Sequence, residues 1–177
     1  MHIWRHFVTI TAHRHQVMRN CFRAGIPLNG LLHDFSKYGL IEFREGARFY
    51  QGTRSPNARE REIKVYSEAW MHHKGKNRHH YEYWTDFVPA HHKYEPVRMP
   101  KRFFAEMLCD RVGASKVYKG SAYTNSSALE YWMKEKEHAV MHPETEQDLE
   151  YFLTLLSEQG EDVFFQTLRR FVKEKQR

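Results

Sequence analysis

Cysteine is scarce in this sequence, where Cys21 and Cys109 are the only two among 177 residues. Two cysteines cannot form the disulfide framework of a small secreted protein, so a reducing compartment is expected. Long apolar runs are also missing, which excludes a membrane-spanning helix, and the histidine-bearing N-terminus lacks the apolar centre of a signal peptide. We therefore expect a cytoplasmic protein without a membrane partner.

Alternating polar and apolar runs are missing too, and no stretch has the pattern of a convincing strand or an internal repeat. Hydrophobic residues make up 41% of the chain and aromatic residues 15%, which suits a folded domain and argues against disorder. The sequence predicts an all-α fold, with a single domain over residues 1–177. The helices from about residue 127 to 177 are expected to pack on the rest of it.

Glycine and proline divide the chain into helical segments. The expected helices cover residues 2–24, 40–50, 58–73, 101–118, 127–141, 144–157 and 161–175, and residues 28–33 form a short apolar piece between the first two. Gly160 separates the last two, and Ser127 with Glu130 has the spacing of a capping box. Residues 51–57 and 120–125 are predicted loops, and residues 85–100, which contain three prolines, are predicted to be irregular.

The net charge of +6 is unevenly distributed along the chain. Residues 74–102 contain seven basic and three acidic residues, whereas residues 128–162 contain ten acidic residues against two lysines. The basic part surrounds a histidine-rich centre, where it would attract a phosphorylated or otherwise anionic ligand. A solvated basic surface is an equally good interpretation of the charge alone.

The segment from Leu32 to Lys37 contains an adjacent His33-Asp34 pair. An imidazole nitrogen beside a carboxylate oxygen is a ready pair of ligands for a divalent metal. Lys37 follows Asp34 by three residues, so its ammonium would leave the same side of a helix and could hold an oxyanion near the metal. Other histidines and aspartates in the chain strengthen the evidence that this pair belongs to a metal site.

Further candidate ligands occur before and after this pair. On the first predicted helix, spacings of three and four residues favour His13 over His15 as the inward histidine, but only slightly. Asp110 lies among apolar residues, where a carboxylate must be hydrogen-bonded, paired or bound to a metal. Four histidines cluster within nine residues: His72, His73, His79 and His80.

Each feature alone has a simpler structural interpretation. A lone inward histidine is usually a hydrogen-bonded core residue, Asp110 could pair with Arg111, and the histidine cluster could be a loop without a metal. Together they favour a metal site, because a histidine, a His-Asp pair, a histidine cluster and an aspartate follow one another on successive helices.

This order resembles the HD-domain superfamily of metal-dependent phosphohydrolases. More closely, the chain is similar to an uncharacterised bacterial and phage family of small HD-like proteins, through motifs such as HDxSK and EMxCDxxGA. The resemblance covers the chain from about His13 to Glu146, and His91 and His92 match nothing in it. It implies an HD-like helical bundle, in which His13 rather than His15 is the first ligand.

The resemblance also implies roles for individual residues. His13, His33, Asp34 and Asp110 would hold a first metal, and His73, His79 and His80 would supply a second, with His72 a weaker candidate. Lys37 would neutralise a phosphate oxygen, and Glu42 would orient water or a metal-bound histidine. The remaining substrate-binding candidates are Lys74, Lys76, Asn77 and Arg78. One or two ions of Mn, Fe, Co, Ni or Zn suit these ligands.

The resulting hypothesis is a metal-dependent phosphohydrolase whose metal-activated water attacks an anionic small molecule, most simply a nucleotide. Two other classes fit the same residues. A di-iron oxygenase would use the His/Asp set to activate dioxygen. A non-catalytic module would bind a nucleotide or nucleic acid through the basic centre, with strong salt dependence and no turnover.

Overall fold

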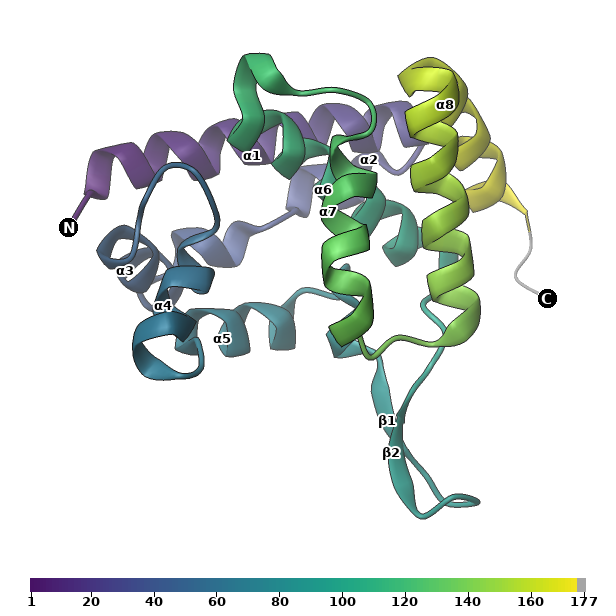
Figure 1. The fold of residues 1–177 in the computed structure, drawn as a ribbon, viewed down its shortest axis with the longest axis horizontal. Helices are drawn as coiled ribbons and strands as arrows, with labels where there is room; N and C mark the ends of the chain where they lie inside the picture. Colours follow the sequence, from purple (N-terminus) through teal and green to yellow (C-terminus); the bar gives the residue numbers. More distant parts are fainter. Residues whose placement is uncertain (175–177) are drawn as a thin grey trace.

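The computed structural model describes residues 1–174 and confirms the all-α fold, with one small sheet added (Figure 1). The helices are α1 (Ile3–Ala24), α2 (Pro27–Leu32), α3 (Leu40–Arg48), α4 (Pro56–Lys64), α5 (Glu68–Lys76), α6 (Lys101–Lys119), α7 (Ser127–Glu135) and α8 (Pro143–Lys173). Short 3-10 turns are η1 (Phe35–Tyr38), η2 (Tyr81–Tyr83), η3 (Gly120–Ala122) and η4 (Lys136–His138). None of the helices within residues 1–174 is long and apolar enough to cross a membrane.

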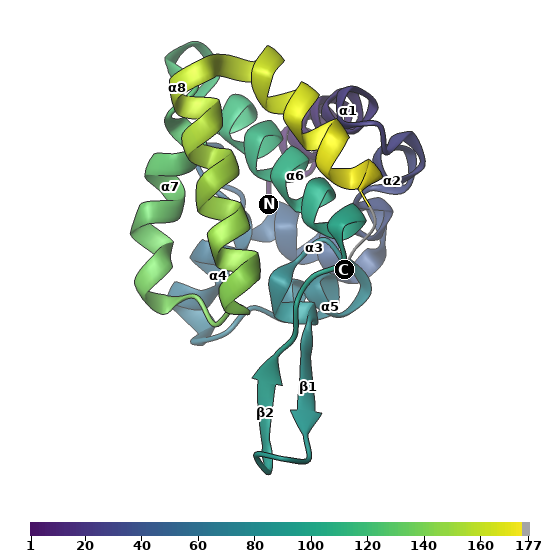
Figure 2. The same cartoon turned by 90° about the vertical axis from the view of Figure 1, so that its right-hand side faces the viewer.

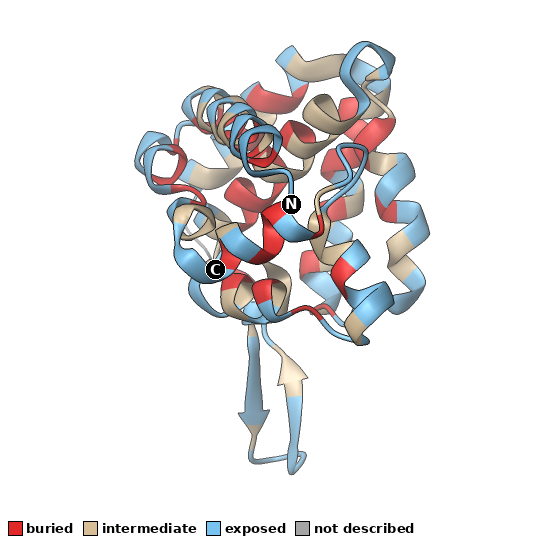
Figure 3. Ribbon diagram, turned by 90° about the vertical axis from the view of Figure 1, so that its left-hand side faces the viewer, coloured by how far each residue is buried: buried red, intermediate tan, exposed pale blue. Residues whose placement is uncertain are grey.

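The hydrophobic core lies where α1, α6, α7 and α8 meet (Figures 2 and 3). Val17, Leu108, Trp132 and Phe152, one from each helix, are fully buried in it. The C-terminal helices α7 and α8 thus pack on α1 and α6. Gly160, with φ of 78°, bends α8 at the expected break, and the predicted helix end at Lys175 lies outside the described residues.

The single helix predicted for residues 58–73 is wrong, because the chain forms α4 and α5 with a break between them. Val65 has a φ of 71°, which ends α4, and the Ser67 hydroxyl accepts a hydrogen bond from the Trp70 amide at 3.0 Å to begin α5. The buried Glu60 carboxylate accepts from the Ser67 hydroxyl and from the Glu68 amide. Local capping therefore overrides the apolar periodicity of this segment.

The irregular structure predicted for residues 85–100 is also wrong in part. Strands β1 (Thr85–Val88) and β2 (Lys93–Pro96) form an antiparallel hairpin that extends from the helical body (Figures 1 and 2). Phe87 and Tyr94 are paired across the strands, with ring centroids 5.6 Å apart. Pro89 and Pro96 lie just after β1 and at the end of β2, so neither interrupts the ladder.

The helix predicted for residues 127–141 ends earlier, at Glu135, and its capping box is not formed. Ser126 rather than Ser127 is the N-cap residue, and no side chain caps the helix. The Ser126 hydroxyl donates to Glu130 at 2.8 Å, while the Ser127 hydroxyl accepts from the Thr124 amide. The serine one position earlier therefore takes the contact with Glu130.

Helices α1 and α6 approach each other closely at Gly113. A β-carbon on Gly113 would lie 2.8 Å from Cγ2 of the fully buried Val17. Nearby, the Asn20 amide donates to the Cys109 carbonyl oxygen at 2.9 Å across the same contact. Gly113 lies one turn after Asp110, and Val17 lies one turn after His13, so this contact sets the separation of two candidate ligands.

We predict that Gly113→Ala destabilises the protein by about 1–3 kcal/mol, because the stiff Val17 side chain cannot move aside in its helix. It should also weaken metal binding by separating His13 from Asp110. Gly75→Ala is the matched control, since a β-carbon there meets nothing within 4 Å. This control should be neutral or stabilise α5 by up to about 1 kcal/mol. Denaturant unfolding measures both changes, and equal stability of the two variants would contradict the prediction.

Candidate metal centre

Four predicted ligands, which come from α1, from α6 and from the residues directly after α2, lie close together. We call them the first ligand set: His13, His33, Asp34 and Asp110. Nε2 of His13 lies 2.9 Å from Oδ1 of Asp110 and 3.6 Å from Oδ2 of Asp34. Nε2 of His33 lies 3.2 Å from the same Asp34 oxygen and 3.5 Å from the same Asp110 oxygen. Two imidazole nitrogens and two carboxylate oxygens thus face one point.

Asp34 reaches this point through an unusual backbone conformation. Its φ of 56° and ψ of 26° lie in the left-handed region, which residues other than glycine seldom adopt. Helix α2 ends at Leu32, and η1 begins directly after Asp34. Strain of this kind is commonly found at functional sites, because the surrounding structure must enforce it. The chain turns here so that the Asp34 side chain is buried.

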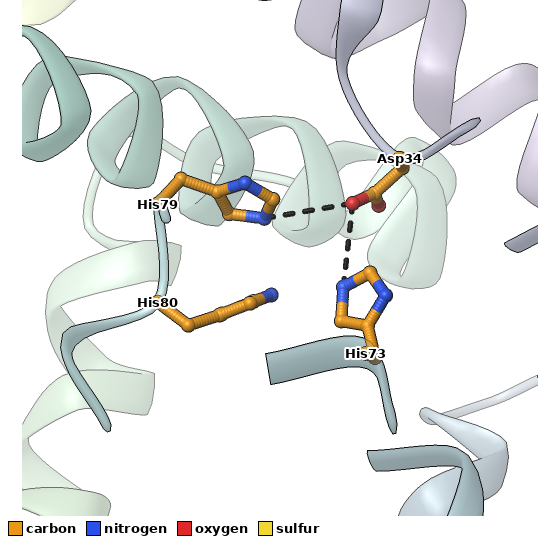
Figure 4. A group of neighbouring side chains, drawn as sticks. All are labelled: Asp34, His73, His79 and His80. Atoms are coloured by element: carbon orange, nitrogen blue, oxygen red, sulfur yellow. Dashed lines mark ion pairs between the residues drawn. The ribbon is translucent and has the colours of Figure 1, made fainter. Parts of the chain in front are cut away.

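The other oxygen of Asp34 faces a second ligand set, formed with His73, His79 and His80 (Figure 4). Nε2 of His73 lies 3.3 Å from Oδ1 of Asp34, and Nε2 of His79 lies 3.5 Å from it. The histidines come from α5 and from the segment after it. Figure 4 shows the His80 ring pointing toward the same space. Asp34 therefore belongs to both sets, with one oxygen directed at each.

Most of the atoms that face these two points are buried without hydrogen-bond partners in residues 1–174. They are Nε2 of His33, His73, His79 and His80, together with Oδ1 of Asp34. Nε2 of His13 and Oδ2 of Asp34 form no hydrogen bond either, but they lie at ion-pair distance from Asp110 and from the Lys37 ammonium, respectively. Buried polar atoms are nearly always hydrogen-bonded, so a convergent group without partners calls for a ligand. A cation would satisfy all of these atoms at once, and the donor set therefore fits one or two divalent metals.

A third group of carboxylates differs from these sets. Glu45, Glu60 and Glu68 also lie close enough to share a cation. Here the ammonium of Lys64 lies 2.9 Å from Glu45, 3.2 Å from Glu60 and 3.5 Å from Glu68. The ammonium of Lys64 already lies among these three carboxylates, and Arg44 contacts Glu45 as well, so side chains of the protein occupy the place that a metal would take.

Carboxylates behind the histidines fix the orientation of their rings. Oε1 of Glu106 lies 3.0 Å from Nδ1 of His33 and 3.3 Å from Nδ1 of His79. Oε2 of Glu42 lies 2.7 Å from Nδ1 of His73. An ionised carboxylate can only accept, so each Nδ1 carries a proton and Nε2 of each ring faces its ligand set. Nearby carboxylates outweigh burial and raise the pKa of His33 and of His73, so a metal would bind these two rings by displacing the Nε2 proton. This arrangement is typical of metal-binding histidines.

The pKa values of the buried groups follow from these contacts. Burial would raise the pKa of Asp34, but the charges of His33, Lys37 and His73 hold it well below its usual range. Burial is likewise outweighed at Glu106, whose pKa falls to about 2 through its hydrogen bonds with His33 and His79. Both carboxylates are therefore ionised at neutral pH.

Burial lowers the pKa of His80 well below its usual range, and the neighbouring His79 and His73 lower it further. Burial also lowers the pKa of His79. Both rings are therefore neutral at pH 7, which is the form in which imidazole binds a metal.

Lys37 lies at the edge of the first ligand set. Its ammonium is 2.5 Å from Oδ2 of Asp34, and 29% of its side chain is exposed. The lysine comes from η1 rather than from a longer α-helix, but residues three apart also share a side of a 3-10 turn. Burial opposes the charge of Lys37, but Asp34 and Asp110 raise its pKa above the usual value. It is a fixed cation at the solvent edge of the centre.

The remaining substrate-binding candidates do not face either ligand set directly. Asn77 donates to the Ser36 hydroxyl at 2.9 Å and to the His73 carbonyl at 2.8 Å, so it supports the second ligand set instead of facing solvent. Lys74 is half-buried, whereas Lys76 and Arg78 are exposed. Within the described residues, no hydrogen bond or ion pair joins these three cations to either set.

Four more histidines, which are His15, His72, His91 and His92, lie outside both ligand sets. His15 is exposed, whereas His13 is buried. His72 contacts Glu42 through Nδ1 at 2.7 Å and belongs to neither set. His91 and His92 lie in the turn of the hairpin and are exposed as well. These positions agree with the preference for His13 and with the weaker rank given to His72.

Sequence reasoning missed Glu106 and Asn29. Glu106 precedes Asp110 by four residues on α6, so both carboxylates lie on one face of the helix. This spacing could have indicated from the sequence that Glu106 belongs to the site. The Asn29 amide donates to Oε2 of Glu106 at 2.7 Å, and no sequence pattern indicated this contact. The role suggested for Glu42, orienting a histidine, agrees with its contact to His73.

We predict that the purified protein contains about two metal ions per chain, one for each ligand set. Asp34→Ala should remove both, because its oxygens serve both sets. His80→Ala should remove only one, because His80 belongs to the second set alone. His15→Ala, which alters an exposed histidine, is the control. Elemental analysis of unchelated protein measures the ratios, and a wild-type protein with only traces of metal would refute the site.

No curated protein and no solved structure matches this chain. The sequence model of a family of unknown function matches residues 2–155, which include every ligand of both sets. On that match, the chain belongs to the family of unknown function DUF5662.

Proposed function

We propose that this protein is a metal-dependent phosphohydrolase that acts on a nucleotide or a related phosphoester. The observation that carries the proposal is the position of Asp34, whose two oxygens each face a separate group of imidazole nitrogens without hydrogen-bond partners. A carboxylate shared between two sites is a common way to hold two metals close together for hydrolysis.

Some residues of the centre would hold the metals, and others would contact the substrate. Metals held by the two sets would activate water and polarise a phosphoryl oxygen. Glu106 and Glu42 keep the rings of His33, His79 and His73 aimed at their ligand sets. The mixed nitrogen and oxygen donors suit Mn, Fe, Co, Ni or Zn.

Lys37 supports a substrate that carries negative charge. Its ammonium is the cation nearest Asp34, and its partly exposed side chain reaches solvent at the edge of the first ligand set. A metal that binds Asp34 competes with Lys37 for the same oxygen, which leaves the ammonium available for a phosphate oxygen. Lys74, Lys76 and Arg78 follow the second set in sequence and add positive charge on that side.

We predict that wild-type protein with added Mn, Co or Ni hydrolyses a phosphomonoester or phosphodiester in a nucleotide screen. Lys37→Ala should lower kcat about 10- to 1000-fold, as loss of a charge-stabilising group does. Its metal content should stay at or above that of wild type, because a competing cation is gone. Lys93→Ala, in the exposed hairpin, is the control and should leave kcat unchanged.

The alternatives give different results in the same experiment. Oxygen consumption by an iron-loaded protein, without phosphoester cleavage, would favour a di-iron oxygenase, since the three histidines of the second set also suit iron. Salt-dependent nucleotide binding without turnover under any metal would favour a binding module. Full activity of Lys37→Ala would refute the phosphate role of this lysine.

A further inference from the structure

The charge on the surface of the N-terminal third is almost entirely positive. Residues 1–59 contain nine basic residues and three acidic ones. The acidic ones, Asp34, Glu42 and Glu45, are all buried, with 5% exposure at most. The described residues 1–59 therefore expose no carboxylate side chain. In contrast, residues 128–162 are strongly acidic and form α7 and much of α8, and α8 lies at the end of the molecule away from α3 (Figure 1).

The same third also exposes large apolar side chains. Trp4 is 73% exposed and Leu40 is 91% exposed. Exposed apolar side chains that gather into one contiguous patch mark an interaction surface. We define the apolar-basic face by its exposed apolar residues on α1, η1 and the start of α3: Met1, Ile3, Trp4, Phe7, Phe35, Leu40 and Ile41.

Contacts between side chains connect these elements into one surface. The rings of Trp4 and Phe7 stack with centroids 5.8 Å apart, and Phe7 meets the ring of Tyr38 at 6.1 Å. Tyr38 lines a surface pocket of about 380 Å³ together with residues from both ends of the face, including Ile3 and Leu40. Farther along α1, the guanidinium of Arg14 lies 4.2 Å from the ring centroid of Phe35.

Arginines border this apolar surface. Arg5 follows Trp4 on α1, Arg14 covers Phe35, and the side chain of Arg44, on α3 beside Ile41, is 74% exposed. Protruding tryptophan, phenylalanine and leucine side chains bordered by arginine are typical of proteins that bind the interface of a bilayer. The apolar side chains enter the boundary of the acyl chains, and the arginines meet anionic headgroups.

We propose that the apolar-basic face docks this protein on a membrane surface that contains anionic lipids. The expectation of no membrane partner rested on the lack of a membrane-spanning segment, which peripheral docking does not require. A second copy of the chain is a poorer occupant, because a symmetric contact would bring the same arginines together without a carboxylate between them. The proposal does not depend on the metal centre.

The test is cosedimentation of wild-type protein with vesicles of phosphatidylcholine, with or without phosphatidylserine. We expect binding to the vesicles with phosphatidylserine and at least a tenfold weaker partition to the neutral ones. Added salt should weaken the binding, because it screens the arginines. The Trp4→Ser/Leu40→Ser variant should lose at least tenfold in partition to the anionic vesicles.

The control is Val65→Ser/Met133→Ser, which removes two similarly exposed apolar side chains outside the face. Its binding should equal that of wild type, and circular dichroism should show that both variants are folded. Three results would overturn the proposal: no wild-type binding to anionic vesicles, equal loss in both variants, or a wild-type dimer that Trp4→Ser/Leu40→Ser converts to monomer without any vesicle binding.

Discussion

The buried charge of Asp34 is the constraint around which the rest of the centre is arranged. A carboxylate in the interior is costly unless cations or donors surround it. Here one oxygen faces His13, His33 and Lys37, and the other faces His73 and His79. The left-handed backbone at this residue shows that the fold accepts local strain to place it. Elements far apart in sequence meet at this single side chain.

Two supporting carboxylates, Glu106 and Glu42, hold histidines of both ligand sets. Glu106 joins the two ligand sets from behind, because His33 belongs to one and His79 to the other. Glu42 secures His73, and α3 is in turn tied to α4 and α5 through the Lys64 ammonium. The close approach of α1 to α6 at Gly113 holds His13 against Asp110. The packing of α1 against α6 therefore sets the distance between the candidate ligands His13 and Asp110.

Much of the fold and centre could be predicted from local patterns. Apolar periodicity and glycine breaks located most helices, and the order of His13, His33-Asp34 and Asp110 indicated candidate ligands whose side chains do converge. The break at Val65 was missed because it depends on Ser67 and Glu60, whose hydrogen bonds form only after folding. The hairpin was missed because its strands are short and mostly exposed, without a buried face to give alternation.

The central claim is that Asp34 is shared by two metal ions. Anomalous diffraction from crystals of metal-loaded protein, recorded on both sides of the metal absorption edge, tests it most directly. The account predicts two peaks, one beside each oxygen of Asp34, with His13 and Asp110 at the first and His80 at the second. A map without a peak at Asp34, or with metal only at the Glu45, Glu60 and Glu68 group, would contradict it.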